Sequence, residues 1–214
     1  MRVNAVLTDD GEQRTDLDSH MDTCVIGQHA LIVHDFNRPV NVTGYDPSKG
    51  TMAPNCRTVL AAVTYDCPIT EGVFIILIHQ IILIDHLHNN LLCPMQMRMY
   101  DVKVNDIPKY LTDNPTDQTH SIVLHERGET LLIPLHLHGV TSYFTSRKPT
   151  MEEYNNCTHF SATAVEPEWD PHNPSFSAQE DALLTTGGLL RERPEGFRGR
   201  FVAGLHLNPC KSLQ

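Results

Sequence analysis

The chain has 214 residues, enough for one domain or for one domain with a tail. Its 40% hydrophobic and 20% charged residues are ordinary for a globular domain. The formal net charge is -10 and basic residues do not cluster, which argues against a surface that binds nucleic acid directly.

The longest apolar run, residues 73–84, is interrupted by His79 and Gln80 and is too short to cross a bilayer as a helix. The first residues lack the apolar core of a signal peptide. Six cysteines without a CxxC pair favour reduced thiols rather than a disulfide framework or a zinc site. We therefore expect a cytoplasmic protein without a membrane segment.

The first half of the chain predicts strands separated by turns. Val, Ile, Leu and Thr dominate five segments, 2–7, 29–36, 39–45, 58–65 and 73–78. Residues 46–50, with a proline followed by a glycine, suit the tip of a hairpin, and residues 66–72 form a second connection.

The pattern then changes. Residues 89–100 predict a short helix, followed by a proline-containing loop over 105–118. Strands are predicted again at 120–126, 129–138 and 140–146. Thr150, with Glu153 three residues later, has the spacing of a capping box that begins a helix.

From about residue 166 the chain loses its periodicity. Three prolines fall within 166–177, a brief helical stretch covers 178–184, and a Gly- and Arg-rich segment follows. The predicted class is mainly β, a small closed barrel with short helices and a poorly structured C-terminal tail, because strands this short need paired edges.

Residues 16–27, DLDSHMDTCVIG, join a cluster of acids and hydroxyls to an apolar strand. Aspartic peptidases need such an arrangement, since their carboxylate must be fixed at a rigid loop tip. Two carboxylates then share one proton, one acting as base toward water and the other as acid toward the carbonyl. A chain with one such motif would obtain the second aspartate from a second copy of itself, in a two-fold homodimer. Asp18 is the candidate catalytic residue and Asp16 the alternative acid.

The same stretch resembles the active-site motif of retropepsins, D-[ST]-G-[AS]-[DS]-T, in which Asp18, Ser19, Asp22 and Thr23 match in place. Residues 81–98 resemble a segment of copia-type retrotransposon proteases, an apolar strand followed by N-L-L-S-x-x-Q-L. Asn90, Leu91, Leu92 and Gln96 occupy the corresponding places. Residues 91–110 and 138–154 also resemble a subgroup of copia-type polyproteins, found in microalgae, that carry D-S-H in place of D-S-G.

This resemblance implies an aspartic endopeptidase of retropepsin fold that cleaves polyprotein junctions as a homodimer and uses no cofactor or metal. It covers about residues 15–155, so residues 1–14 become a lead-in that we expect to be truncated, and 156–214 a linker or tail with one short helix. Asn90, Leu91 and Leu92 would form the second hydrophobic motif. Position alone makes the hairpin with Tyr45, Asp46 and Gly50 the flap that covers the peptide substrate.

His20 stands where the family has glycine, whose backbone N–H helps to hold the catalytic carboxylate. A side chain fits there only if φ is negative or the loop is rebuilt. His20 would then either tune Asp18 or mark a catalytically silent remnant of the fold. Asp22 and Thr23 are expected to support the loop through side-chain hydrogen bonds to the backbone.

A third interpretation is a small β-domain that binds metal. Alternating histidines, at 86 and 88 and at 136 and 138, would project from one face of a strand as zinc ligands do. Histidines that merely alternate with leucines explain the same pattern. Cys24 and Cys93 lie in apolar surroundings and are expected to be buried, inert thiols.

Overall fold

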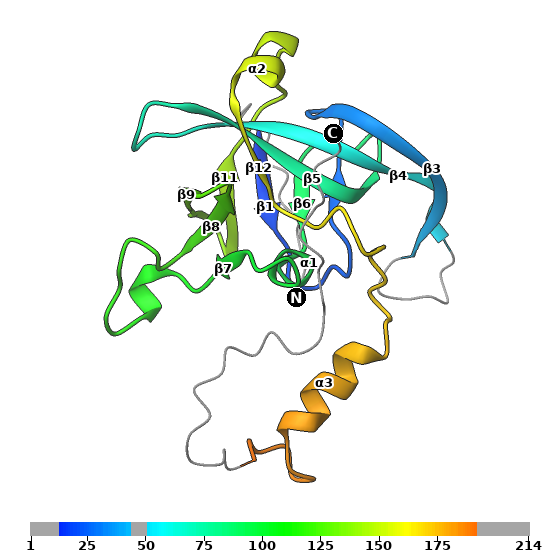
Figure 1. The fold of residues 1–214 in the computed structure, drawn as a ribbon, viewed down its shortest axis with the longest axis vertical. Helices are drawn as coiled ribbons and strands as arrows, with labels where there is room; N and C mark the ends of the chain where they lie inside the picture. The colour runs from blue at the N-terminus through cyan, green and yellow to red at the C-terminus, as the bar shows by residue number, and fades with distance from the viewer. Residues whose placement is uncertain (1–12, 44–50, 192–214) are drawn as a thin grey trace. The chain divides into compact units, whose positions relative to one another are not determined.

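The computed structural model describes residues 13–43 and 51–191. The chain divides into two compact units, with the boundary between Pro171 and His172. The first unit contains all the strands of both sheets and is mainly β, as the composition of its segments predicts (Figure 1).

Nine strands of the first unit form one mixed sheet. Eight of them follow the order β10-β11-β1-β6-β2-β5-β4-β3, and β12 pairs with β5. Their bounds are β1 Arg14–Leu17, β2 Val25–Ile26, β3 Leu31–Thr43, β4 Thr51–Asp66, β5 Val73–Leu83, β6 Asn90–Leu92, β10 His136–His138, β11 Thr141–Thr145 and β12 Thr158–Ser161.

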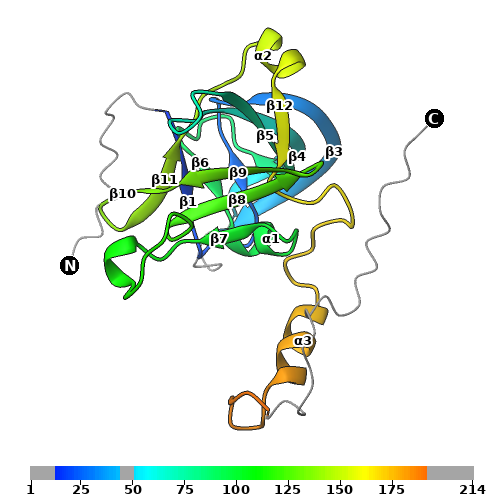
Figure 2. The same ribbon diagram turned by 60° about the vertical axis from the view of Figure 1, so that its left-hand side comes forward.

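A smaller antiparallel sheet consists of β7 (Lys103–Asn105), β8 (Ser121–Glu126) and β9 (Glu129–Pro134). Figure 2 shows the β8–β9 hairpin in front of the main sheet. In the described part of the first unit, the sheets are accompanied by α1 (Pro94–Arg98), the 3-10 turn η2 (Lys109–Leu111) and α2 (Met151–Asn156).

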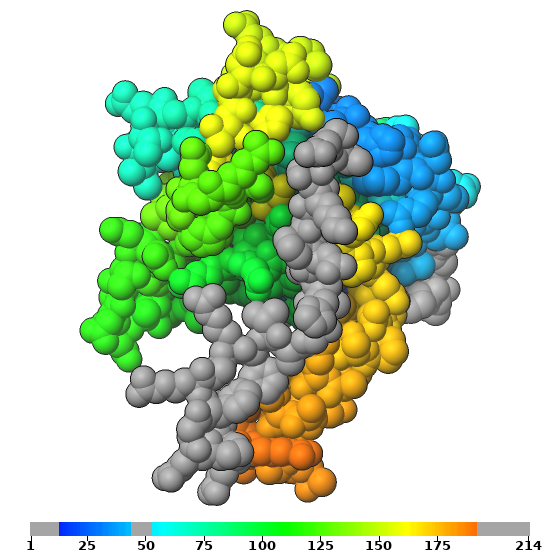
Figure 3. All heavy atoms as spheres, viewed as in Figure 1, coloured from blue at the N-terminus to red at the C-terminus, as the bar shows by residue number. Residues whose placement is uncertain are grey.

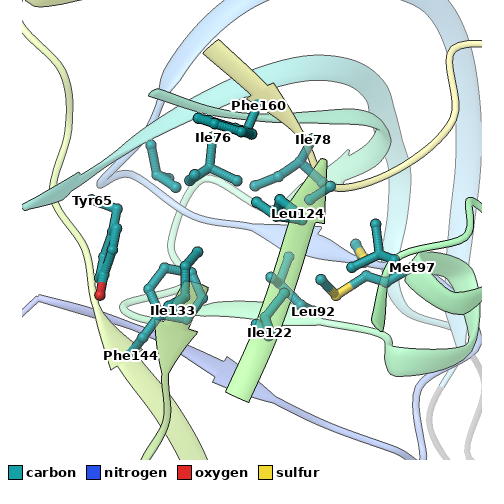
Figure 4. Packing of buried hydrophobic residues seen from close by; sticks show 14 of the residues in the cluster. Tyr65, Ile76, Ile78, Leu92, Met97, Ile122, Leu124, Ile133, Phe144 and Phe160 are labelled. Carbon is teal, nitrogen blue, oxygen red and sulfur yellow. The ribbon is translucent and has the colours of Figure 1, made fainter. Parts of the chain in front are cut away.

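The hydrophobic core lies between the two sheets (Figure 4). Ile122 and Leu124 of β8 and Ile133 of β9 belong to the same buried cluster as the apolar side chains of the main sheet. That cluster includes Ile76, Ile78, Leu92, Met97, Phe144 and Phe160. Burial of these apolar side chains is the main favourable contribution to the stability of the fold.

Closure into a barrel, expected from the sequence, is not found among the described residues. β10 and β3 are the two ends of the strand order and do not pair with each other. Side chains of the second sheet instead share one buried cluster with those of the main sheet. β3 remains half exposed, and its pairing with β4 shifts register at several bulges.

Most predicted strands are found, though with different bounds. The segments at 29–36 and 39–45 are parts of one long strand, β3, and 58–65 lies within β4. The helix predicted at 89–100 is wrong in its first part, because Asn90–Leu92 pairs with both β1 and β2. The capping box at Thr150 and Glu153 is confirmed, with α2 beginning at the next residue. The strand predicted at 2–7 lies outside the described residues.

The second unit contains one described helix, α3 (Ser175–Leu183), close to the helix predicted at 178–184. It has no buried residue. Among the described residues of both units, no helix is long and apolar enough to span a membrane.

Candidate active-site loop

The first strand delivers Asp18 to the edge where two parallel strands end. β1 and β6 run parallel with Leu17 opposite Leu92, so both carboxyl ends lie at one edge of the sheet. The Asp18 backbone N–H donates to the Leu92 carbonyl at 3.0 Å. This bond fixes the start of the loop over residues 18–23, which we call the Asp18 loop.

The far end of the Asp18 loop is fixed on the opposite side of β6. β2 pairs antiparallel with β6 through Val25 and Leu91, and parallel with β5. The loop therefore crosses the end of β6. Leu17, Val25 and Leu92 are all buried, so the loop leaves and re-enters the sheet at apolar anchors. The sequence therefore places its acids between two apolar segments because a polar loop here joins two buried strands.

The carboxylate of Asp18 is held by the loop itself. The His20 backbone N–H donates to Asp18 Oδ1 at 2.9 Å, while the Asp18 side chain remains 39% exposed. The imidazole Nδ1 of His20 lies 3.7 Å from the same oxygen, but that side chain is 91% exposed. An ion pair this exposed contributes little. The carboxylate is thus oriented by a backbone amide and open to solvent.

His20 fits the loop without backbone strain. The described non-glycine residues with left-handed φ are Asn37, Asn55, Glu71, Gln80, Asp101, His120 and Arg127, and none of them lies in the Asp18 loop. Met21, the next residue, packs partly buried against the core. A side chain at position 20 requires a φ outside the left-handed region, and His20 meets this requirement.

A layer of buried polar groups supports the loop from below. The Cys24 backbone N–H donates to Gln96 Oε1 of α1 at 2.8 Å, and the Cys93 N–H donates to Cys24 Sγ at 3.1 Å. Cys93 Sγ lies 3.0 Å from the Met21 carbonyl. Both cysteines are buried, as expected, and burial raises the pKa of both thiols.

Asn90 ties together the strands that carry the loop. Its side-chain oxygen accepts from the Gly27 N–H at 3.1 Å, and its amide donates to Thr15 Oγ1 at 3.3 Å. Thr15 in turn lies 2.7 Å from Ser146 Oγ. Asn90 is buried, and so is Leu92, whereas Leu91 is half-buried. This predicted motif is thus a structural support behind the loop.

Asp16, the alternative acid, is buried within the sheet. Arg14 Nε lies 3.0 Å from Asp16 Oδ1, and Asn89 donates to Asp16 Oδ2 at 3.2 Å. Burial raises the pKa of the Asp16 carboxyl, and the Arg14 guanidinium works against that shift. A carboxyl so enclosed is poorly placed to reach a substrate.

The sequence did not indicate one residue that contacts the loop, Trp169. Its indole Nε1–H lies 2.9 Å from the Asp22 carbonyl and 3.2 Å from Thr23 Oγ1. Asp22 and Thr23 thus contact Trp169 through a backbone carbonyl and a side-chain hydroxyl. Ser19 is exposed. The only signal for Trp169 was that it is the single tryptophan of the chain.

Other predicted positions lie away from this loop. Tyr45, Asp46 and Gly50 fall outside the described residues. In the described part of the chain no three His, Cys, Asp or Glu side chains gather as a metal site would require. A cleft of about 600 Å3, lined by residues such as His79, Arg127 and His159, contains none of the predicted site residues.

Comparisons with known proteins do not assign this chain to a family: no protein-family model, curated protein or solved structure matches it significantly.

Proposed function

We propose that the chain is the aspartic endopeptidase segment of a copia-type retrotransposon polyprotein. Two chains would form the active site, each contributing Asp18. The substrate would be the Gag-Pol polyprotein of the element, cleaved at its junctions in the cytoplasm, within virus-like particles if the element is active. No cofactor or metal takes part in this chemistry.

The main observation that supports the proposal is the way in which the backbone positions the Asp18 carboxylate. Two paired parallel strand ends present the carboxylate, and the backbone N–H of His20 donates to one of its oxygens at 2.9 Å. This is the role that the resemblance assigns to the family glycine. Catalytic groups on rigid elements keep the geometry that acid–base chemistry needs.

The chemistry follows from bringing two such carboxylates together. Like charges about 3 Å apart cannot both ionise, so one proton is shared between them. The ionised Asp18 would take a proton from water, which attacks the peptide carbonyl. The protonated Asp18 of the twin would donate to the carbonyl oxygen. A closed two-fold dimer supplies this pairing.

The flap assignment is also part of the proposal. β3 and β4 are long antiparallel strands, 13 and 16 residues, that form the arms of one hairpin. Tyr45, Asp46 and Gly50 lie between these arms in sequence. In a retropepsin-type fold this hairpin would cover the bound peptide. The alternative is a silent remnant of that fold, which His20 in place of glycine favours.

The test is a cleavage assay between about pH 4 and 7. The wild-type protein, Asp18→Asn and Asp113→Asn would be incubated with a long stretch of the parent polyprotein, with and without pepstatin. Asp113 is an exposed acid and serves as the matched control.

We expect the wild type and Asp113→Asn to cut, pepstatin to inhibit both, and Asp18→Asn to be inactive. Equal cutting by all three proteins would contradict the assignment of Asp18. A folded wild-type protein that cuts nothing would favour the silent remnant.

A further inference from the structure

The segment that follows β12 crosses from the central strand to the Asp18 loop. We call residues 162–170 the strap. Its first residues are fixed to β5: the Ala162 N–H donates to the Leu77 carbonyl at 2.8 Å. Thr163 Oγ1 accepts from the His79 N–H and donates to the His79 carbonyl, both at 2.8 Å.

Gln80 organises the middle of the strap. Its side-chain amide nitrogen lies within 3.1 Å of the carbonyls of Ala164, Val165 and Pro167, and its Oε1 accepts from the Trp169 N–H at 2.6 Å. Gln80 is only 4% exposed and has a left-handed φ of 56°. Buried amides with several partners fix a backbone firmly. Gln80, in the middle of the apolar strand β5, therefore fixes the backbone of the strap, which has no regular secondary structure.

The end of the strap contacts two parts of the proposed active site. The Trp169 indole N–H reaches Asp22 and Thr23 in the Asp18 loop. Glu168 forms an ion pair with Arg38 on β3, one arm of the proposed flap. Figure 3 shows the yellow strap beside the blue strand β3 at the surface of the first unit.

The Asp18 loop is held at Met21 by Cys93 and at Cys24 by Gln96, and Trp169 contacts the two residues between them. Asp18 is tied to Leu92 at its start, and a 3.4 Å bond from the Met21 N–H to the Asp18 carbonyl closes the turn. Trp169 supplies the bonds at the other end, at Asp22 and Thr23. Loss of these two contacts would loosen the loop on the C-terminal side of Met21, and the His20 N–H just before Met21 orients the carboxylate.

We infer that Trp169 is a positioning residue for Asp18, held in place by Gln80, and that the strap belongs to the catalytic unit. This inference rests on the proposed function. The active unit then extends to residue 170, beyond the boundary at 155 that the resemblance implies. A cut between Val165 and Trp169 would leave both sheets intact and weaken the contacts of Trp169 with Asp22 and Thr23.

The first test compares Trp169→Phe with Asp113→Asn in the full-length protein. Trp169→Phe keeps an aromatic ring but removes the indole N–H, and Asp113 is an exposed residue outside the strap and the Asp18 loop. We expect Trp169→Phe to lower kcat about tenfold with KM changed less than about twofold, since small misplacements of catalytic groups are costly. Asp113→Asn should match the wild type, and all three proteins should show cooperative thermal unfolding. Equal kcat values for Trp169→Phe and the wild type would overturn the inference.

The second test does not depend on activity. Trp169 is the single tryptophan, so its fluorescence reports the strap alone. Gln80→Glu replaces the amide donor by a carboxylate facing three carbonyls. We expect acrylamide to quench Trp169 about twofold more strongly in this variant, as for a locally opened segment. Quenching equal to the wild type would refute the hold of Gln80 on the strap. If the wild-type protein cleaves nothing but Gln80→Glu still increases the quenching of Trp169, the proposed function is refuted. The hold of Gln80 on the strap is then still supported.

Discussion

The carboxylates of Asp18 and Glu153 each accept a backbone N–H from a residue two or three positions away, and their surroundings differ. Thr150 donates to Glu153 Oε2 at 2.8 Å, and His20 donates to Asp18 Oδ1 at 2.9 Å. Glu153 also faces Arg147, whose guanidinium bonds both of its oxygens and both oxygens of Asp66. Asp18 faces an imidazole that is 91% exposed.

The difference separates a carboxylate that stabilises the fold from one available for chemistry. The hydrogen bonds from Arg147, and then that from Thr150, lower the pKa of Glu153 to about 2. That carboxyl is ionised throughout the ordinary pH range and joins α2 to the end of β4. Asp18 lacks such a guanidinium among the described residues. Substitution at Glu153 should therefore change stability, and substitution at Asp18 should change activity.

The largest expected effect is that of Asp18→Asn. The variant keeps the hydrogen bond from His20, so its free energy of unfolding should lie within about 0.5 kcal/mol of the wild type. Cleavage should fall at least about a thousandfold, as for loss of a reacting group. Urea unfolding and peptide hydrolysis on the same sample measure the two quantities. A destabilised variant would mean that Asp18 is structural, like Glu153.

Arg147→Met should show the opposite behaviour. Arg147 also bonds the backbone of Thr64 on β4, at 2.7 and 3.1 Å, and those bonds survive the change. Loss of the guanidinium leaves Asp66 and Glu153 without their cation, at a cost of about 1–2 kcal/mol after allowance for its exposure. Chemical denaturation measures this loss, and kcat should not change. An unchanged free energy of unfolding would contradict the claim that Glu153, unlike Asp18, stabilises the fold.

Thr150→Ala removes the N-cap of α2. Thr150 Oγ1 accepts from the Glu153 N–H at 3.1 Å, and loss of such a cap costs about 1 kcal/mol. Thr150→Ser keeps the hydroxyl and is the matched control. Thermal unfolding should rank the wild type with the Ser variant above the Ala variant. Equal midpoints for all three would show that the capping box contributes nothing.

The smallest effect is a dependence on pH. Because the pKa of Glu153 is lower in the folded protein than its ordinary value of 4.5, its contribution to stability is present above about 4.5. It is lost as the pH falls toward 2. Unfolding free energies measured across this range should fall less steeply for Glu153→Gln than for the wild type. Identical slopes would contradict the pairing with Arg147.

Local patterns predicted the elements that local forces determine. The capping box at Thr150 depends on residues three apart, and the strand at 73–78 on its apolar composition. The segment Asn90–Leu92 was predicted as helix because its pairing partners, in β1 and β2, are about 70 residues away. A sheet partner at that separation overrides local propensity.

The candidate loop was found because its acids lie next to one another in sequence. The strap was missed because Gln80 and Trp169 are 89 residues apart and neither belongs to a motif. In the sequence, Gln80 is only an interruption of an apolar run. Buried amides within apolar strands are signals of long-range hydrogen bonding, but they do not name the partner.

The measurement that tests the central claim most directly is subunit mixing. Wild-type and Asp18→Asn chains would be unfolded together, refolded at a fixed total concentration and assayed for cleavage. If each active site needs Asp18 from both chains, an equal mixture retains about a quarter of the activity of pure wild type, because mixed dimers are inactive. Retention of about half would mean that each chain cuts independently, and the shared-aspartate site would be wrong.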